Sequence, residues 1–163
     1  MAATYNNSYG AVMLTDGGTP RIITVKARSN ISGGYWVNGS SAAGIVGSGA
    51  ETYIASDIEG YPVSTQVGSL VIGLALTDIA SGTYGPVAMR GLFLLPVLSG
   101  TTAGSIFAGQ PVIAGSAGTV TPLTSGTHLP LSDAAGVKLH PVGRAISTGA
   151  GENGDFVVVS LNV

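Results

Sequence analysis

Glycine is the residue that most limits what this chain can fold into. It occupies 26 of the 163 positions. No window of a dozen residues keeps a 3.6-residue apolar period without a glycine inside it, and glycine within a helix costs about 1 kcal/mol relative to alanine. Short Val, Ile, Leu and Thr runs alternate with clusters of Gly, Ser, Asn and Pro, a pattern typical of short strands and tight turns. The sequence therefore predicts an all-β fold.

Alternating or short apolar runs mark the individual strands. The clearest is "RIITVKAR", residues 21–28, whose successive side chains point to opposite faces. Asn38-Gly39 is typical of a type I′ turn, and the run from Glu152 to Asp155 indicates a hairpin before the last strand. The remaining strand candidates are residues 52–55, 70–77, 85–95, 105–114, 118–123, 137–147 and 155–162.

The length of the chain fits one domain, or a small domain with a long arm. Residues 1–20 are polar and rich in turn formers, so we interpret them as an extended N-terminal arm. Residues 21–163 then form a single β domain, with a loop excursion at about 40–69. We expect this domain to be a small β-barrel or a sandwich.

A weak internal repeat runs through that domain, over residues 31–89 and 106–159. "ISGGYWV" at 31–37 is similar to "IFAGQPV" at 106–112, and residues 71–89 align without gaps on residues 141–159. The matched residues are Ile31 with Ile106, Gly34 with Gly109, Val37 with Val112, Gly73 with Gly143, Ala75 with Ala145, and Val87 with Val157. Either this is a duplicated β-unit, or it is a chance similarity in a chain of low complexity.

Charged residues make up only 9% of the chain, against roughly 25% in an ordinary soluble domain. A membrane span would need about 20 consecutive apolar residues, but the apolar runs stop at Thr77-Asp78 and at Pro96. We therefore expect no membrane segment and attribute the apolar excess to burial against other chains. The start of the chain shows no signal peptide and there is no cysteine, so we expect synthesis in a cytoplasm.

The charge balance gives no support to nucleic acid as a partner. The net charge is -2, whereas phosphate binding needs a basic face. The one basic cluster is Arg21, Lys26 and Arg28. We interpret these residues as solvated positions on a strand.

Chemistry-bearing residues are too few for a convincing active site. The only histidines are His128 and His140; Ser132 and Asp133 lie near His128, but no nucleophile-elbow motif accompanies them. Calcium could be bound if Glu51, Asp57 and Glu59 folded together; otherwise these are solvated loop carboxylates. We predict no enzyme activity, no catalytic residue, no metal and no cofactor.

Four segments, taken in order, resemble the tailed-phage capsid cement or decoration family. They are "ISGGYWVNG" (31–39), "VIGLALTDIASGTYGPVAMRGLFLLP" (71–96), "IFAGQPVIAGSAGTVTPL" (106–123) and "PVGRAISTGAGENGDFVVVSLNV" (141–163). The resemblance covers roughly residues 20–163, and its specificity lies in the succession of these motifs. The arm and residues 40–69 are longer than is usual in the family.

The resemblance implies a β-rich structural protein on the outside of a viral head. It further implies a homotrimer that clamps neighbouring subunits of the major capsid protein. If the resemblance holds, we expect aromatic and apolar side chains to contact either another copy of the chain or the capsid. The candidate contact residues are Tyr5, Tyr9, Tyr35, Trp36, Tyr53, Tyr61, Phe93 and Leu94.

The role of the aromatic residues is open in two respects: whether they are core or contact residues, and what kind of partner they would contact. Tyr35 and Trp36 are adjacent and point to opposite faces, so we expect at most one of them in the core. The aromatics between 35 and 61 would also suit a carbohydrate-binding or adhesive module on a virion surface or fibre. Glycan binding that depends on Trp36 would favour this second function.

Overall fold

A computed structural model describes most of the predicted β domain. The described residues are 12–14, 21–39, 59–62, 71–98, 105–123, 141–149 and 155–163. The predicted strand at 52–55, both histidines and the turn at 152–154 lie outside these ranges. The all-β prediction is confirmed, since the described residues form strands and one short 3₁₀ helix, η1.

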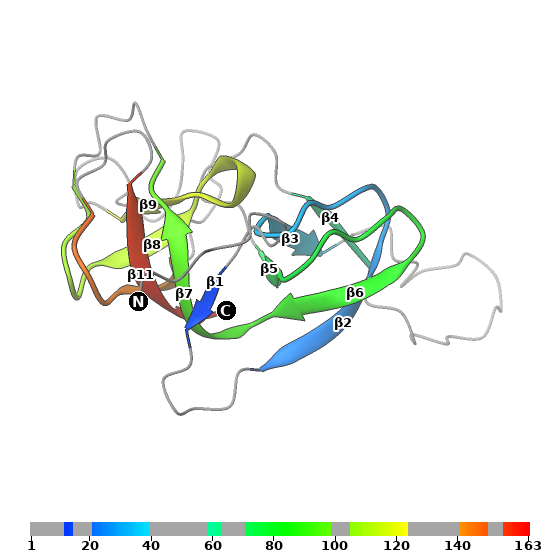
Figure 1. Cartoon of the computed structure of the whole chain (residues 1–163), viewed down its shortest axis with the longest axis horizontal. Helices are drawn as coiled ribbons and strands as arrows, with labels where there is room; N and C mark the ends of the chain where they lie inside the picture. The colour runs from blue at the N-terminus through cyan, green and yellow to red at the C-terminus, as the bar shows by residue number, and fades with distance from the viewer. Residues whose placement is uncertain are drawn as a thin grey trace, which may run out of the picture.

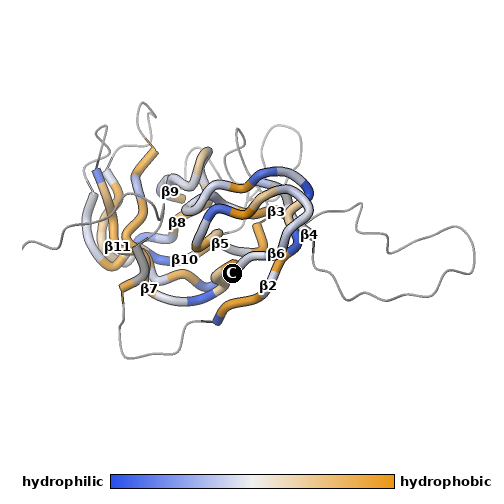
Figure 2. Tube along the Cα trace, turned by 45° about the vertical axis from the view of Figure 1, so that its right-hand side comes forward, coloured by the Kyte–Doolittle hydropathy of each residue, from blue (hydrophilic) through white to orange (hydrophobic). Residues whose placement is uncertain are grey.

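The strands are short, as the spacing of the glycines indicates. The elements are β1 (Val12–Leu14), β2 (Ile22–Ala27), β3 (Trp36–Gly39), β4 (Glu59–Pro62), β5 (Gly73–Ala75), β6 (Tyr84–Ala88), β7 (Arg90–Pro96), β8 (Pro111–Ala114), η1 (Ser116–Gly118), β9 (Val120–Pro122), β10 (Pro141–Ala145) and β11 (Phe156–Asn162). Hydrophobic positions recur along the strands of both halves of the molecule (Figure 2).

These strands make two sheets that lie side by side (Figure 1). One sheet has six strands in the order β1-β7-β11-β10-β8-β9. The other closes on itself in the order β2-β4-β3-β5-β6, so each of its strands has two neighbours. The ring is antiparallel except where β2 and β4 run parallel.

The same order of pairing occurs twice along the chain. In the first unit, the described part of residues 21–89, β2 pairs with β6, then β5, β3 and β4 follow. In the second unit, the described part of residues 90–163, β7 pairs with β11, then β10, β8 and β9 follow. Each unit ends on a parallel contact, Ala27 with Gly60 in the first and Val97 with Val120 in the second. Among the described residues, one additional strand, β1, pairs with the second unit.

Hydrogen bonds of the predicted repeat follow this equivalence. The Gly34 N–H donates to the Ala75 carbonyl at 2.8 Å, and the Gly109 N–H donates to the Ala145 carbonyl at 2.7 Å. The residues matched in the two sequence segments thus take part in matching contacts.

The strand register extends the equivalence and corrects one of the matches. Val37 pairs with Gly73, and Val112 pairs with Gly143, as the sequence alignment places them. Beyond the hairpin turn, however, Ala75 pairs with Val87 whereas Ala145 pairs with Val159. Val87 therefore corresponds to Val159 and not to Val157, because the second hairpin is two residues longer.

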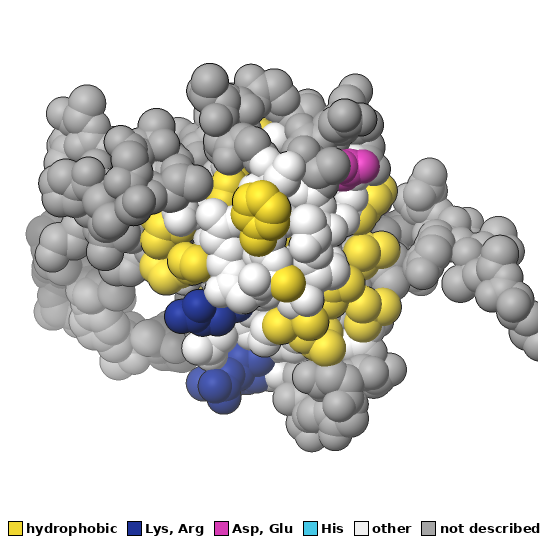
Figure 3. Space-filling model, turned by 90° about the vertical axis from the view of Figure 1, so that its left-hand side faces the viewer, with side chains coloured by type: hydrophobic (Ala, Val, Ile, Leu, Met, Phe, Trp, Pro, Cys, Tyr) yellow, Lys and Arg dark blue, Asp and Glu magenta, His cyan; other side chains and the backbone are white. Residues whose placement is uncertain are grey.

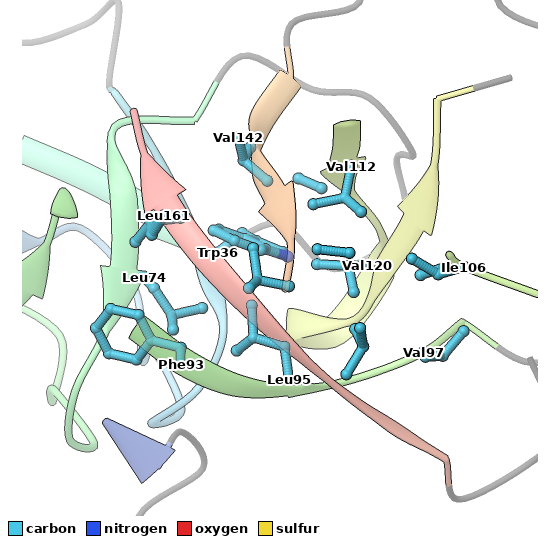
Figure 4. Close-up of a cluster of buried hydrophobic side chains, with 14 of the residues drawn as sticks. Trp36, Leu74, Phe93, Leu95, Val97, Ile106, Val112, Val120, Val142 and Leu161 are labelled. Atoms are coloured by element: carbon cyan, nitrogen blue, oxygen red, sulfur yellow. The ribbon is translucent and has the colours of Figure 1, made fainter. Parts of the chain in front are cut away.

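A large apolar core lies between the two units (Figure 4). Most of its side chains come from the second unit, including Phe93 and Leu95 of β7. Trp36 and Leu74 reach into it from the first unit. The indole N–H of Trp36 donates to the Thr119 carbonyl at 2.7 Å. A second, smaller cluster fills the ring and comprises Val25, Ala27, Ile31, Val37, Ala75, Ile79 and Val87.

Three local predictions are corrected by pairings between distant residues. Asn38 and Gly39 are not a turn, because they lie in β3 opposite Tyr61 and Gly60. The single strand predicted at 85–95 is two strands, β6 and β7, which pair with different partners. Part of the predicted excursion, residues 59–62, is the strand β4 that closes the ring.

Candidate functional site

Two of the predicted contact residues are core residues. Trp36 and Phe93 are both fully buried in the large core. Their side chains cannot reach a partner of the folded chain, so the prediction that they contact one is wrong. It follows that Trp36 cannot stack on a sugar, which removes one of the aromatic side chains on which the adhesive interpretation depended.

The remaining predicted contacts fall into two groups. Tyr35 is half-buried against the smaller core while Trp36 fills the larger one, so both faces of this strand are covered. Only Trp36 of the pair is a core residue, as the alternation of side chains predicted. Tyr5, Tyr9 and Tyr53 lie outside the described residues, and only the backbone of Tyr61 is described.

Leu94 is the predicted contact residue that faces outward. It lies on β7 between the buried residues Phe93 and Leu95 and is itself half-buried. Because side chains alternate along a strand, Leu94 and Pro96 lie on the face opposite the core. On neighbouring β11 the same face carries Phe156 and Val158, which pair with Pro96 and Leu94 respectively.

We call this surface the outer apolar patch; its residues are Leu94, Pro96, Ile146, Phe156 and Val158. Ile146 joins it because the Ile146 N–H donates to the Val158 carbonyl at 2.7 Å. Ile146 and Phe156 are each 54% exposed, although both are large hydrophobic residues. Figure 3 shows hydrophobic side chains gathered on this side of the molecule, with Lys or Arg side chains near its lower border.

The first unit shows that the fold does not require apolar residues at these positions. By the equivalent strand pairings, Thr24 takes the place of Leu94 and Lys26 that of Pro96. Tyr84 takes the place of Phe156; it is 55% exposed, and the Lys26 ammonium lies 5.6 Å from its ring centroid. Pro86 takes the place of Val158, so this face of the first unit is mixed, and the architecture does not require a wholly apolar one. The apolar face of the second unit needs another explanation, and contact with a partner provides one.

Two arginines lie on strands of the sheet that bears the outer apolar patch, Arg90 on β7 and Arg144 on β10. The guanidinium of Arg144 donates to the Gly109 carbonyl at 2.9 Å, and that of Arg90 donates to the Asn162 side-chain oxygen at 2.9 Å. Both arginines are exposed. An apolar centre with polar groups around it is the usual composition of a protein–protein interface.

The patch could have been found in part from the sequence. The alternation in "DFVVVSLNV" separates Phe156 and Val158 from Val157 and Val159, but it does not say which set is buried. Pro96 and Ile146 give no such signal, because each reaches the patch through pairing with a distant strand.

The described residues contain no group of three or more His, Cys, Asp or Glu side chains that could hold a metal ion. His128, Ser132, Asp133, Glu51 and Asp57 lie outside the described ranges, and for Glu59 only the backbone is described. Within the described part of the chain, the structure has no helix of the length and apolarity that crossing a membrane requires.

Comparison with known proteins identifies a family whose model the sequence matches. The family model described as "Phage cement protein" matches residues 55–161, more than half of the chain. No curated protein matches the sequence. Among solved structures, the head fiber gp8.5 N base of bacteriophage phi29 is similar, with 16% sequence identity and a TM-score of 0.46. That similarity covers 88% of this chain and 95% of the phi29 chain.

Proposed function

The chain belongs to the phage cement protein family, and from this premise we propose that it binds the outer surface of an assembled head and stabilises contacts between major capsid subunits. As a member of that family, it is a capsid-associated structural protein of the virion. The stabilisation needs no catalysis. A protein that binds the assembled shell and not its separated subunits shifts the equilibrium toward the shell.

The proposal includes association of the protein with itself, as a homotrimer, through the outer apolar patch. The observation that carries it is the contrast between the two units, with Leu94 and Phe156 on one and Thr24 and Tyr84 on the other. Contacts between identical copies in permanent oligomers are more apolar than transient ones. The low overall content of charged residues agrees with a chain that is buried against neighbours.

Shell stabilisation is the direct test of the function. Heads assembled without this protein should disassemble at a higher temperature, or at a higher denaturant concentration, when the purified protein is added. At a free concentration of 100 times Kd, the linkage is about 2.7 kcal/mol per site. The measurement is a melting curve of the shells at several protein concentrations. A melting temperature that does not change at saturating occupancy would contradict stabilisation.

Self-association is tested by a matched pair of substitutions, Phe156→Ser and Tyr84→Ser. The two side chains occupy equivalent positions, with 54% and 55% exposure. We expect Phe156→Ser to weaken association about tenfold or more, as truncation of a central interface aromatic does, and Tyr84→Ser to leave it unchanged. The measurement is mass by light scattering over a concentration series. Equal effects of the two changes would show that the patch is not the contact.

The sequence of the first unit suggests a double substitution that should dissociate the trimer without unfolding the chain. The double change Leu94→Thr with Pro96→Lys gives β7 the residues that β2 carries at Thr24 and Lys26. Since the same pairing pattern accommodates these residues in the first unit, the variant should fold with a thermal midpoint close to that of the parent. Its light-scattering mass should fall to that of one chain at concentrations where the parent is a trimer. A folded variant that remains trimeric would place the contact elsewhere.

A further inference from the structure

We propose that the outer edge of β2, at residues 22–24, accepts an extended segment of the major capsid protein as an additional antiparallel strand. This inference rests on the proposed function, because it identifies the part of the chain that meets the capsid. It involves the first unit, whereas the outer apolar patch belongs to the second.

The orientation of the β2 backbone follows from its hydrogen bonds. The Arg21 carbonyl accepts from the Met89 N–H, and the Ala27 N–H donates to Thr83, so the backbone groups of the odd-numbered residues point toward β6. Those of Ile22 and Thr24 then point to the opposite side. On that side β4 pairs only with Lys26 and Ala27, and no strand of the described residues pairs with 22–24.

The equivalent edge in the second unit is occupied. There Leu92 and Leu94 of β7 correspond to Ile22 and Thr24, and they pair with Leu14 and Val12 of the antiparallel strand β1. Farther along, the Leu98 N–H donates to the Val120 carbonyl, just as the Arg28 N–H donates to Gly60. The backbone geometry at this edge is therefore one that an antiparallel strand fits, as the chain itself demonstrates.

The number of strands argues for an occupant other than β1. Each chain has one β1 and two equivalent edges, at 22–24 and at 92–94. If copies exchanged β1 among themselves, every chain would still retain one edge that β1 does not fill. If the protein binds a capsid, the major capsid protein lies next to this edge and can supply the missing strand. Addition of a strand to an open sheet edge is a common mode of recognition.

The side chains at this edge define the chemistry of the segment it would take. Ile22 is 44% exposed and Thr24 is exposed, so the edge itself carries neither proline nor a charged side chain, the usual protections of an unpaired edge. The exposed side chain of Arg21 lies at the start of this edge, whereas β4 covers the strand beyond its other end. We therefore expect the capsid segment to be extended, with an apolar residue beside Ile22 and a carboxylate toward Arg21.

A substitution at Thr24 separates backbone pairing from side-chain effects. Thr24→Pro removes an N–H that does not bond to β6, and its ring blocks an incoming strand. Thr24→Val, the control, keeps the N–H. With heads that lack the protein as the binding target, we expect Thr24→Pro to bind roughly tenfold more weakly or worse, as the loss of about two backbone hydrogen bonds would give. Thr24→Val should bind like the parent, and both variants should keep its thermal unfolding midpoint.

Hydrogen exchange on the unaltered protein supplies a second measurement that does not depend on the folding of a variant. The amides of Ile22 and Thr24 should exchange rapidly in the free protein and become protected when it is bound to heads. Protection in dilute free protein would assign the edge to another segment of the same chain. Protection that grows with protein concentration, without heads, would assign it to a second copy. Either result overturns the proposal.

The two proposals fail in distinguishable ways. If the parent binds heads and Thr24→Pro binds them equally well, the edge is not the docking site, while the cement function stands. If the parent does not bind heads at all, the proposed function fails first and the strand-acceptor site fails with it.

Discussion

Trp36→Ala is expected to lower the free energy of unfolding by about 3–5 kcal/mol, the range for truncating a large buried aromatic. Trp36 is fully buried and belongs to the first unit, yet it packs in the core of the second. Its removal leaves a cavity at the junction of the units. It also leaves the Thr119 carbonyl without the indole N–H that it accepts at 2.7 Å.

Trp36→Phe is the control that separates the loss of packing from the loss of the hydrogen bond. Phenylalanine keeps much of the ring volume but has no N–H to donate. We expect it to cost about 1–3 kcal/mol, less than alanine, because the hydrogen bond is lost and a smaller cavity remains. Denaturant unfolding followed by circular dichroism measures both variants, since each lacks the only tryptophan. Equal losses for alanine and phenylalanine would contradict the packing role.

Gly118→Ala is expected to have the second large effect, again at the junction between the units. Gly118 has φ of 80°, and a Cβ atom there would collide with the Gly34 carbonyl oxygen. That atom is backbone, so it cannot move aside as a flexible side chain would. We expect a loss of about 4 kcal/mol or more, or failure to fold, since the collision forces η1 away from the first unit.

Gly82→Ala separates this collision from the cost of the backbone conformation alone. Gly82 has nearly the same φ, 78°, but a Cβ atom there would have no atom within 4 Å. It should cost only about 1–2 kcal/mol, the cost of holding an alanine in the left-handed region. Urea unfolding of both variants gives the comparison. If Gly118→Ala were no worse than Gly82→Ala, the tight contact with Gly34 would not contribute to stability.

The substitutions at Trp36 and Gly118 should change occupancy on the capsid only by changing the fraction of protein that is folded. The residues concerned are buried, whereas the outer apolar patch and the edge of β2 are exposed. At temperatures where a Trp36→Phe variant remains folded, its occupancy on heads should therefore equal that of the parent. Reduced occupancy of a fully folded variant would indicate that the packing of the units sets the geometry of docking.

Which strands form was largely predictable from the sequence, but where they end and what they pair with was not. "RIITVKAR" alternates clearly and forms β2 within one residue of each end. The Asn38-Gly39 pair has the residues of a turn, but its backbone groups bond to β4, some twenty residues later. Intrinsic strand preferences span only about 1 kcal/mol, so the turn preference of Asn-Gly yields to a strand pairing that completes a closed ring.

The candidate site was likewise predictable from the sequence only in part. The sequence singled out Phe93 and Leu94 together, and alternation required that they face opposite sides. Only the pairing of β7 with β11 shows that Phe93 faces the core and that Leu94 joins Val158 on the outside. Phe156 and Ile146 were not singled out, because a patch assembled from two strands and the residue that follows a third has no contiguous signal in the chain.

The sequence by itself determined the all-β class, the positions of most strands, and the matching of segments that later share the same hydrogen bonds. These are local properties, set by glycine spacing, by alternation and by short motifs. The tertiary structure decided which face of each strand is covered, that Trp36 is core, and that one unit bears an apolar outer face where the other bears Thr24 and Lys26. Burial depends on partners far away in the chain, and periodicity identifies two faces without saying which one the rest of the protein will cover.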